Sequence, residues 1–213
     1  MPSNQEMNIK VTSVTPETIE QKLTKYHEFF AIKHEFTLNI LPLTADKGAS
    51  FEQFLIDMPT PFKMASDMSS IDQAALRPLQ ALSGVASQLV EFLNHQSSKI
   101  DLLIGYILSQ QDDEVHRYQG VQFGGGGLSF TARKPYELAQ LLEMKIFLLS
   151  ENCGVYCYGE VIEVEQNHDV YLHKVIFHFI REDDREVLVR TSLHEQSKQL
   201  QTLAKQRNQE GKK

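Results

Sequence analysis

The sequence predicts an α+β protein in which a long helix precedes a small antiparallel β-barrel. Two observations carry this prediction. Apolar residues recur at alternating steps of four and three along residues 70–111, and five short runs rich in Val, Ile, Phe and Tyr follow within residues 118–179. The chain has 213 residues, 41% hydrophobic and 23% charged, which is the composition of a folded protein able to bury a core.

The first half of the chain is predicted to be helical, over residues 15–112, after a disordered segment over residues 1–14. Thr15-Pro16-Glu17 combines a capping hydroxyl, a proline and an acid, the residue types that favour a helix start. Apolar residues then continue at steps of three and four, so we predict one helix from Pro16 to about Leu41. A short helix is predicted around residues 51–58.

The helix predicted over residues 70–111 has the apolar spacing of a coiled coil. At 1.5 Å per residue it would be about 60 Å long, which is longer than a small domain, so it needs partner helices. We therefore expect a homo-oligomer, either a dimer or a tetramer; the alternative is that this stripe covers the core of its own chain. The predicted oligomer seam consists of Leu79, Leu82, Ala86, Leu89, Leu93, Gln96, Ile100, Leu103 and Ile107.

Beyond residue 114 the periodicity changes from helical to strand-like. The predicted strands are Tyr118–Phe123, Leu128–Ala132, Met144–Leu149, Tyr156–Glu165 and Val170–Phe179. Their short connections favour an antiparallel sheet that closes, or nearly closes, into a barrel without exposed edges. Acidic residues at 182–184 then predict the start of a final helix, which ends in a basic tail over residues 201–213.

Charge and hydropathy exclude several classes of protein. The chain has 21 Lys and Arg against 28 Asp and Glu, a net charge of −7, which argues against a protein that neutralises nucleic-acid phosphates. It contains no run of about 18 apolar residues and begins without the pattern of a secretion signal. We therefore expect a cytoplasmic protein with no nucleic-acid or membrane partner, and we expect its basic tail to be a solvated helix end.

The run Gly124–Gly127 is predicted to be a tight turn between two strands rather than a phosphate-binding loop. A phosphate-binding loop of the GxxxxGK[ST] type would continue with Lys and Ser or Thr and then a helix. Here Leu128-Ser129-Phe130 continues as a strand. Glycine suits such a turn because it accepts backbone conformations that other residues avoid.

The remaining chemistry-bearing residues predict no metal site and no enzyme. Cys153 and Cys157 are two thiols without nearby histidines, too few for a zinc site and expected to be buried or edge thiols. His173 and His178 are an odd number of residues apart, so on a strand they face opposite sides. No group of acid, base and nucleophile stands together in the sequence.

Four segments resemble the PilZ family of bacterial second-messenger domains, over about residues 115–200. They are VQFGGGGLSF (121–130), MKIFL (144–148), YGEVIEV (158–164) and KVIFHF (174–179). The preceding KIDLL (99–103), on the heptad helix, resembles the atypical branch of that family, in which a long helix drives tetramer formation. This resemblance implies a small PilZ-like barrel with a signalling role in motility or biofilm regulation.

Standard members of this family bind cyclic di-GMP through an Arg-x-x-x-Arg segment and an Asp/Asn-x-Ser-x-x-Gly motif. With the last glycine of that motif at Gly127, Gly124 stands in place of the serine and Gln122 in place of the acid or asparagine. Upstream arginines are Arg77 and Arg117, which lack the required spacing. Arginine forks and short polar side chains supply the directed bonds to phosphate and base, so we expect binding to be weak or absent.

The leading hypothesis is therefore a non-enzymatic oligomeric adaptor that acts through protein partners of unknown identity and needs no cofactor. Its degenerate ligand site would comprise Arg117, Gln122, Gly124 and Gly127. A first alternative is a working cyclic di-GMP receptor whose arginines come from elsewhere, such as Arg133 or a neighbouring chain. A second, which the residues favour less, is an enzyme built on the barrel.

Overall fold

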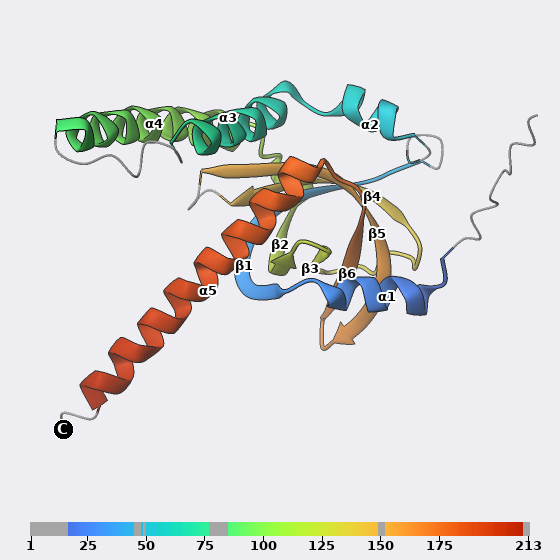
Figure 1. The fold of residues 1–213 in the computed structure, drawn as a ribbon. Helices are drawn as coiled ribbons and strands as arrows, with labels where there is room; N and C mark the ends of the chain where they lie inside the picture. Colours follow the sequence, from blue (N-terminus) through green and yellow to red (C-terminus); the bar gives the residue numbers. More distant parts are fainter. Residues whose placement is uncertain (1–16, 45–47, 49, 77–84, 149–151, 211–213) are drawn as a thin grey trace, which may run out of the picture.

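The computed structural model describes residues 17–44, 48, 50–76, 85–148 and 152–210. These residues form a closed antiparallel barrel with helices packed on its outer surface (Figure 1). The elements are, in order, α1 (Ile19–Glu28), β1 (Ala31–Pro42), α2 (Phe51–Asp57), α3 (Thr60–Leu76), α4 (Val85–Ser109), a 3₁₀ turn η3 (Glu114–His116), β2 (Arg117–Gly124), β3 (Gly127–Ala132), β4 (Leu141–Leu148), β5 (Cys153–Asn167), β6 (Val170–Phe179) and α5 (Glu182–Glu210). The predicted α+β class is confirmed.

The barrel follows the order β1-β2-β3-β6-β5-β4, and every neighbouring pair is antiparallel. Five of these strands are the five that the sequence predicts, and the helices predicted near residue 51 and after residue 181 are also present as α2 and α5. The sixth strand, β1, closes the barrel by pairing with β2 on one side and β4 on the other. The barrel therefore needs a strand from far outside residues 115–200.

The prediction of one helix from Pro16 to Leu41 is wrong. The helix α1 is shorter, and its N-cap is Thr18, whose hydroxyl accepts from the Gln21 amide in a capping box. From Ala31 the chain is extended, and Phe36, Leu38 and Ile40 alternate into the barrel core. Their spacing fits a strand as well as a helix, and pairing with two neighbouring strands satisfies the backbone of this segment as a helix would.

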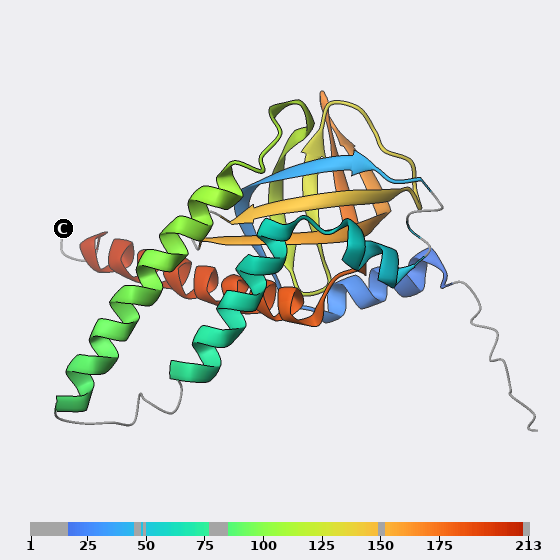
Figure 2. The same cartoon turned by 90° about the horizontal axis from the view of Figure 1, so that it is seen from above.

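The prediction of one continuous helix over residues 70–111 is also wrong. The segment spans the end of α3 and all of α4, and these two helices lie side by side, so the chain reverses between them (Figure 2). Residues 77–84 lie outside the described part, as do the predicted seam residues Leu79 and Leu82 and the side chain of Ala86. The predicted disordered segment, residues 1–14, is likewise outside it.

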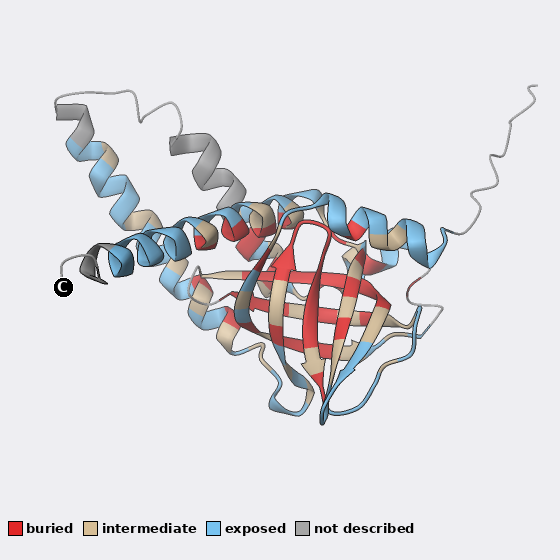
Figure 3. Ribbon diagram, turned by 90° about the horizontal axis from the view of Figure 1, so that it is seen from below, coloured by how far each residue is buried: buried red, intermediate tan, exposed pale blue. Residues whose placement is uncertain are grey.

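Two apolar clusters hold the fold together. One fills the barrel, whose strands consist largely of buried residues (Figure 3). Its side chains such as Phe123, Phe130 and Met144 are fully buried. The other lies outside the barrel, where the rings of Phe54, Phe62, Phe147, Tyr156 and Tyr158 pack beneath α2, α3 and α4. Fully burying a large apolar side chain contributes roughly 1.5–3 kcal/mol, so this aromatic cluster attaches the helices to the barrel.

The helix α4 has a second apolar face that the described residues leave partly exposed. Its barrel-facing side is formed by Ile104 and Leu108, which are 8% and 0% exposed. The described apolar seam residues lie about a quarter of a helical turn away from this barrel-facing side, at 3.6 residues per turn. Leu89, Leu93, Ile100, Leu103 and Ile107 are 60%, 37%, 39%, 64% and 41% exposed. In the described part of the chain, these exposed fractions favour an oligomer seam over the alternative, in which the stripe covers the core of its own chain.

Candidate functional site

The glycine run forms the turn between β2 and β3, as the sequence predicts, and all four glycines are buried. Two helices cover it: α1 and the beginning of α5. Arg185 donates a hydrogen bond to the Gly125 carbonyl oxygen and lies over the Phe29 ring, 5.5 Å from its centroid. The Tyr26 hydroxyl lies 3.0 Å from the Ser129 hydroxyl. The turn that carries the degenerate motif is therefore closed to solvent.

Neither end of this turn has room for a side chain. A Cβ atom on Gly124 would lie 2.2 Å from the Phe30 carbonyl oxygen, and one on Gly127 would lie 2.1 Å from the Val175 carbonyl oxygen. Because these obstacles are main-chain atoms, no rotamer change relieves them. The place that a motif serine would occupy is filled by the main chain that joins α1 to β1.

The structure keeps Gln122 close to this turn but places Arg117 at the opposite end of β2. Gln122 is half-buried and pairs with Lys33 and Ser129 on the neighbouring strands. Arg117 precedes Gly124 by seven residues, which is roughly 24 Å along a strand at 3.4 Å per residue. Of the four predicted ligand-site residues, Arg117 is thus separated from the other three.

Arg117 is held by acidic neighbours. Its Nη2 atom lies 2.7 Å from Asp112 Oδ2 and 3.6 Å from Glu114 Oε1, and the bond to Asp112 raises the pKa of the guanidinium. The Asn39 amide nitrogen in turn donates to Asp112 Oδ1 at 2.8 Å. Arg117 therefore fixes the segment between α4 and β2 onto the barrel.

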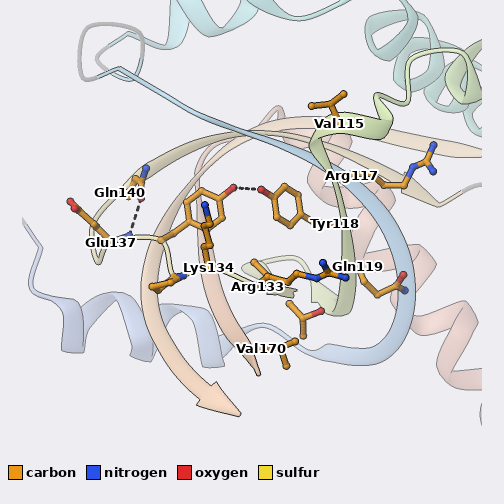
Figure 4. A pocket seen from close by; sticks show the side chains of 13 residues that line it. Val115, Arg117, Tyr118, Gln119, Arg133, Lys134, Glu137, Gln140 and Val170 are labelled. Atoms are coloured by element: carbon orange, nitrogen blue, oxygen red, sulfur yellow. Dashed lines mark hydrogen bonds between the residues drawn. The ribbon is translucent and has the colours of Figure 1, made fainter. Parts of the chain in front are cut away.

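At this end of the barrel lies a groove of about 1000 Å³, between the start of β2 and the loop from β3 to β4 (Figure 4). Its lining residues are Val115, Arg117, Tyr118, Gln119, Thr131, Ala132, Arg133, Lys134, Pro135, Tyr136, Glu137, Gln140 and Val170. The groove brings Arg117 and Arg133 into one site, at the far end of the strands from the glycine turn. Sequence reasoning named both arginines but missed the groove and its two tyrosines.

Hydrogen bonds fix the β3–β4 loop that forms one wall of the groove. The Tyr136 amide donates to His173 Nε2 at 3.0 Å, and the Tyr136 hydroxyl donates to that of Tyr118 at 2.7 Å. The Ala139 amide donates to the Val161 carbonyl oxygen at 2.8 Å. His173 is fully buried and stacks on Phe130, with ring centroids 4.7 Å apart. The wall is therefore attached to both β5 and β6.

We predict that acid weakens the fold through His173. Burial lowers the pKa of this histidine, so the native state keeps it neutral, whereas the unfolded chain takes up a proton near pH 6.5. Stability is then lost as the pH falls from about 7 to 5, by at most about 1.4 kcal/mol per pH unit. Urea unfolding at about pH 7 and about pH 5 should show that the free energy of unfolding falls less between these values for His173→Gln than for the wild type. The exposed control His95→Gln should match the wild type.

The other candidate ligands stay apart. Cys157 is buried in the barrel core, where burial raises the pKa of its thiol, and Cys153 is half-buried. His173 is buried and His178 exposed, on opposite faces as predicted. Among the described residues, no three His, Cys, Asp or Glu side chains are placed to hold a metal ion. None of the described helices is both long enough and apolar enough to span a membrane.

Comparison with known proteins matches residues 94–193 to the PilZ domain. The fold is also similar to a protein from Xanthomonas campestris described as a new tetrameric PilZ domain that self-assembles through an unusual helical bundle. That match has 12% identity, covers 84% of this chain and 96% of that one, and has a TM-score of 0.52. The two chains therefore share a fold over most of their lengths.

Two further structural matches are partial and cover less than half of each protein. The Bacillus subtilis inhibitor of motility (MotI/DgrA) is 14% identical, with 38% of this chain and 42% of that chain covered and a TM-score of 0.37. MrkH of K. pneumonia is 14% identical, with 41% and 44% covered and a TM-score of 0.34. The chain thus spans less than half the length of either protein. No curated protein matches.

Proposed function

Because this chain belongs to the PilZ domain family, we propose that it is a non-enzymatic signalling adaptor in bacterial motility or biofilm regulation. In this proposal α4 assembles the chain into an oligomer, and the barrel acts through contacts with other proteins. The nucleotide motif of the family is retained as a fold element and no longer as a ligand site.

The closed glycine turn is the observation that carries this proposal. A nucleotide phosphate needs open main-chain amides or short polar side chains that it can approach. Here the motif serine is replaced by Gly124, and the Phe30 carbonyl oxygen lies where that side chain would begin. Tyr26 of α1 and Phe29, the C-cap of that helix, cover the same turn. These contacts support an adaptor that does not use this site for a nucleotide.

The exposed seam of α4 supports the oligomer. Monomeric proteins rarely leave a continuous row of large apolar side chains in water, and helices that carry such a row at heptad spacing bury it against one another. The described seam residues lie on a helix that projects past the barrel (Figure 2), where a second copy can reach them. The tetrameric assembly of the Xanthomonas protein, which shares this fold, lends further support.

A calorimetric titration with cyclic di-GMP, with the molar mass measured by light scattering on the same sample, tests the proposal. We expect no saturable heat at micromolar concentrations. Each lost charge-assisted bond weakens binding by roughly 1.5–3 kcal/mol, so three lost bonds weaken a micromolar binder by about three decades or more. The variant Arg117→Ala should not change any residual heat. Tight, stoichiometric binding would contradict the proposal.

One observation favours a second candidate, a cyclic di-GMP receptor with an unusual site. Arg117 and Arg133 line the same groove, although no Arg-x-x-x-Arg segment joins them in the sequence. If the titration gives tight binding that Arg133→Ala abolishes, the receptor is correct and the groove is its site.

A further inference from the structure

We propose that the groove between the start of β2 and the β3–β4 loop is a docking surface for an acidic protein segment that carries an apolar anchor residue. This inference rests on the proposed function, because an adaptor needs a surface for its partner. It names that surface and the chemistry of the partner. The argument uses the charge, the apolar rim and the rigidity of the groove.

The groove presents two cations for which the described residues provide no counterion. Arg133 and Lys134 follow β3 and are exposed, and within the described part of the chain neither forms a hydrogen bond or an ion pair. Arg117, by contrast, is already paired with Asp112. Among the lining residues Glu137 is the acid, against three basic residues. The groove is therefore locally basic although the whole chain has a net charge of −7. A surface of this charge selects an acidic partner.

The rim of the groove is apolar and projects into solvent. Val115 is 84% exposed and Val170 is 39% exposed, and both line the groove. A small ligand is held in a concave site that buries most of its surface, and it would leave these rim side chains in water. A protein segment lying along the groove would cover them.

The aromatic floor matches the composition of protein interfaces. Tyrosine and arginine are enriched at the residues that dominate binding energy in such interfaces. Here the rings of Tyr118 and Tyr136 pack edge to face, 6.1 Å apart between centroids, and both line the groove together with Arg133 (Figure 4). An apolar side chain of the partner would pack against these rings while its neighbouring carboxylates meet Arg133 and Lys134.

Both sides of the groove are already in place before a partner binds. The β3–β4 loop is attached through Tyr136 to His173 and through Ala139 to Val161. On the other side, the Asp113 amide donates to Asn39 Oδ1 at 2.8 Å, and Asp113 caps the turn that carries Val115. Binding to a surface that is already formed avoids the entropy cost of ordering loops.

The test is a selection of sixteen-residue peptides from a random display library against the full-length protein. Selected peptides are then synthesised with a fluorescent label and measured by anisotropy against four proteins: the wild type, Arg133→Glu with Lys134→Glu, Val115→Asp, and the control Lys205→Glu with Arg207→Glu. The control reverses one Lys and one Arg on exposed positions of α5, so it changes the net charge equally. All substituted side chains are exposed, so the fold should be retained, which circular dichroism checks.

We expect the selected peptides to carry Asp or Glu on both sides of an apolar residue. Their affinity should fall at least tenfold for Arg133→Glu with Lys134→Glu, should fall also for Val115→Asp, and should be unchanged for the control. A selection that enriches no peptide, enriches peptides without acids, or enriches peptides that bind the groove variants as well as the wild type overturns the inference but leaves the adaptor proposal standing. Cyclic di-GMP bound in the groove would overturn both.

Discussion

The double variant Leu89→Asp with Ile100→Asp is expected to be a folded monomer of 24.4 kDa, whereas the wild type should scatter as a multiple of this mass. Both side chains lie on the exposed seam of α4, so the carboxylates stay in water in the monomer. In the oligomer the same carboxylates would be buried in an apolar interface without partners, which costs several kcal/mol per charge. Light scattering measures the mass, and circular dichroism checks the helix content.

Leu102→Asp is the matched control for this experiment. Leu102 lies on the same helix and is 66% exposed, but it falls outside the steps of four and three that define the seam. Its substitution should leave the mass of the assembly unchanged. If the double variant keeps the wild-type mass, or if Leu102→Asp dissociates the assembly equally, the interface lies elsewhere.

The second large effect is expected from Gly124→Ser, which restores the serine of the family motif. We expect this variant to lose about 3 kcal/mol of stability and to gain no cyclic di-GMP binding, because its Cβ would lie 2.2 Å from the Phe30 carbonyl oxygen. To accommodate it, the chain between α1 and β1 must move, which disturbs the first pairs between β1 and β2. Thermal and urea unfolding measure the loss.

Gly126→Ser separates this clash from a general intolerance of the turn to side chains. A Cβ on Gly126 would lie 3.0 Å from the Phe29 ring, which can shift, and 3.3 Å from the Tyr26 carbonyl oxygen, a far looser contact than the 2.2 Å at Gly124. We expect this control to lose much less stability than Gly124→Ser. A Gly124→Ser protein that is as stable as the wild type and binds the dinucleotide would show that the turn opens in solution.

The strands from residue 117 onward could be predicted because the sequence of each segment fits a strand and not a helix. Their β-branched and aromatic content, their turns and their alternation all agree. β1 could not, because Phe36 and Ile40 are four residues apart, which fits a helix face, and also fall on alternate positions with Leu38, which fits a strand. Only pairing with β2 and β4 decides between helix and strand for this segment. That pairing exists only in the folded chain and cannot be read from the local sequence.

The candidate site divides in the same way. The turn at Gly124–Gly127 could be predicted as structural because a strand follows it directly. What could not be predicted is that the main chain at Phe30 fills the place of the motif serine, since residues 30 and 124 meet only through the register of β1 on β2. The groove was equally hidden, because the contact of Tyr136 with His173 joins residues 37 positions apart.

The position of β1 in the chain has a consequence for how the molecule folds. Its partners begin at Arg117 and Leu141, so a ribosome that has just made β1 must add more than a hundred further residues before both neighbours exist. Contacts between residues so distant in sequence slow folding. Until they form, β2 and β4 have unpaired edges, the kind of surface on which strands of different chains pair and aggregate. The early helices α2 and α3 cover part of the outer surface of the barrel. The barrel itself closes only when β1 has paired with both β2 and β4.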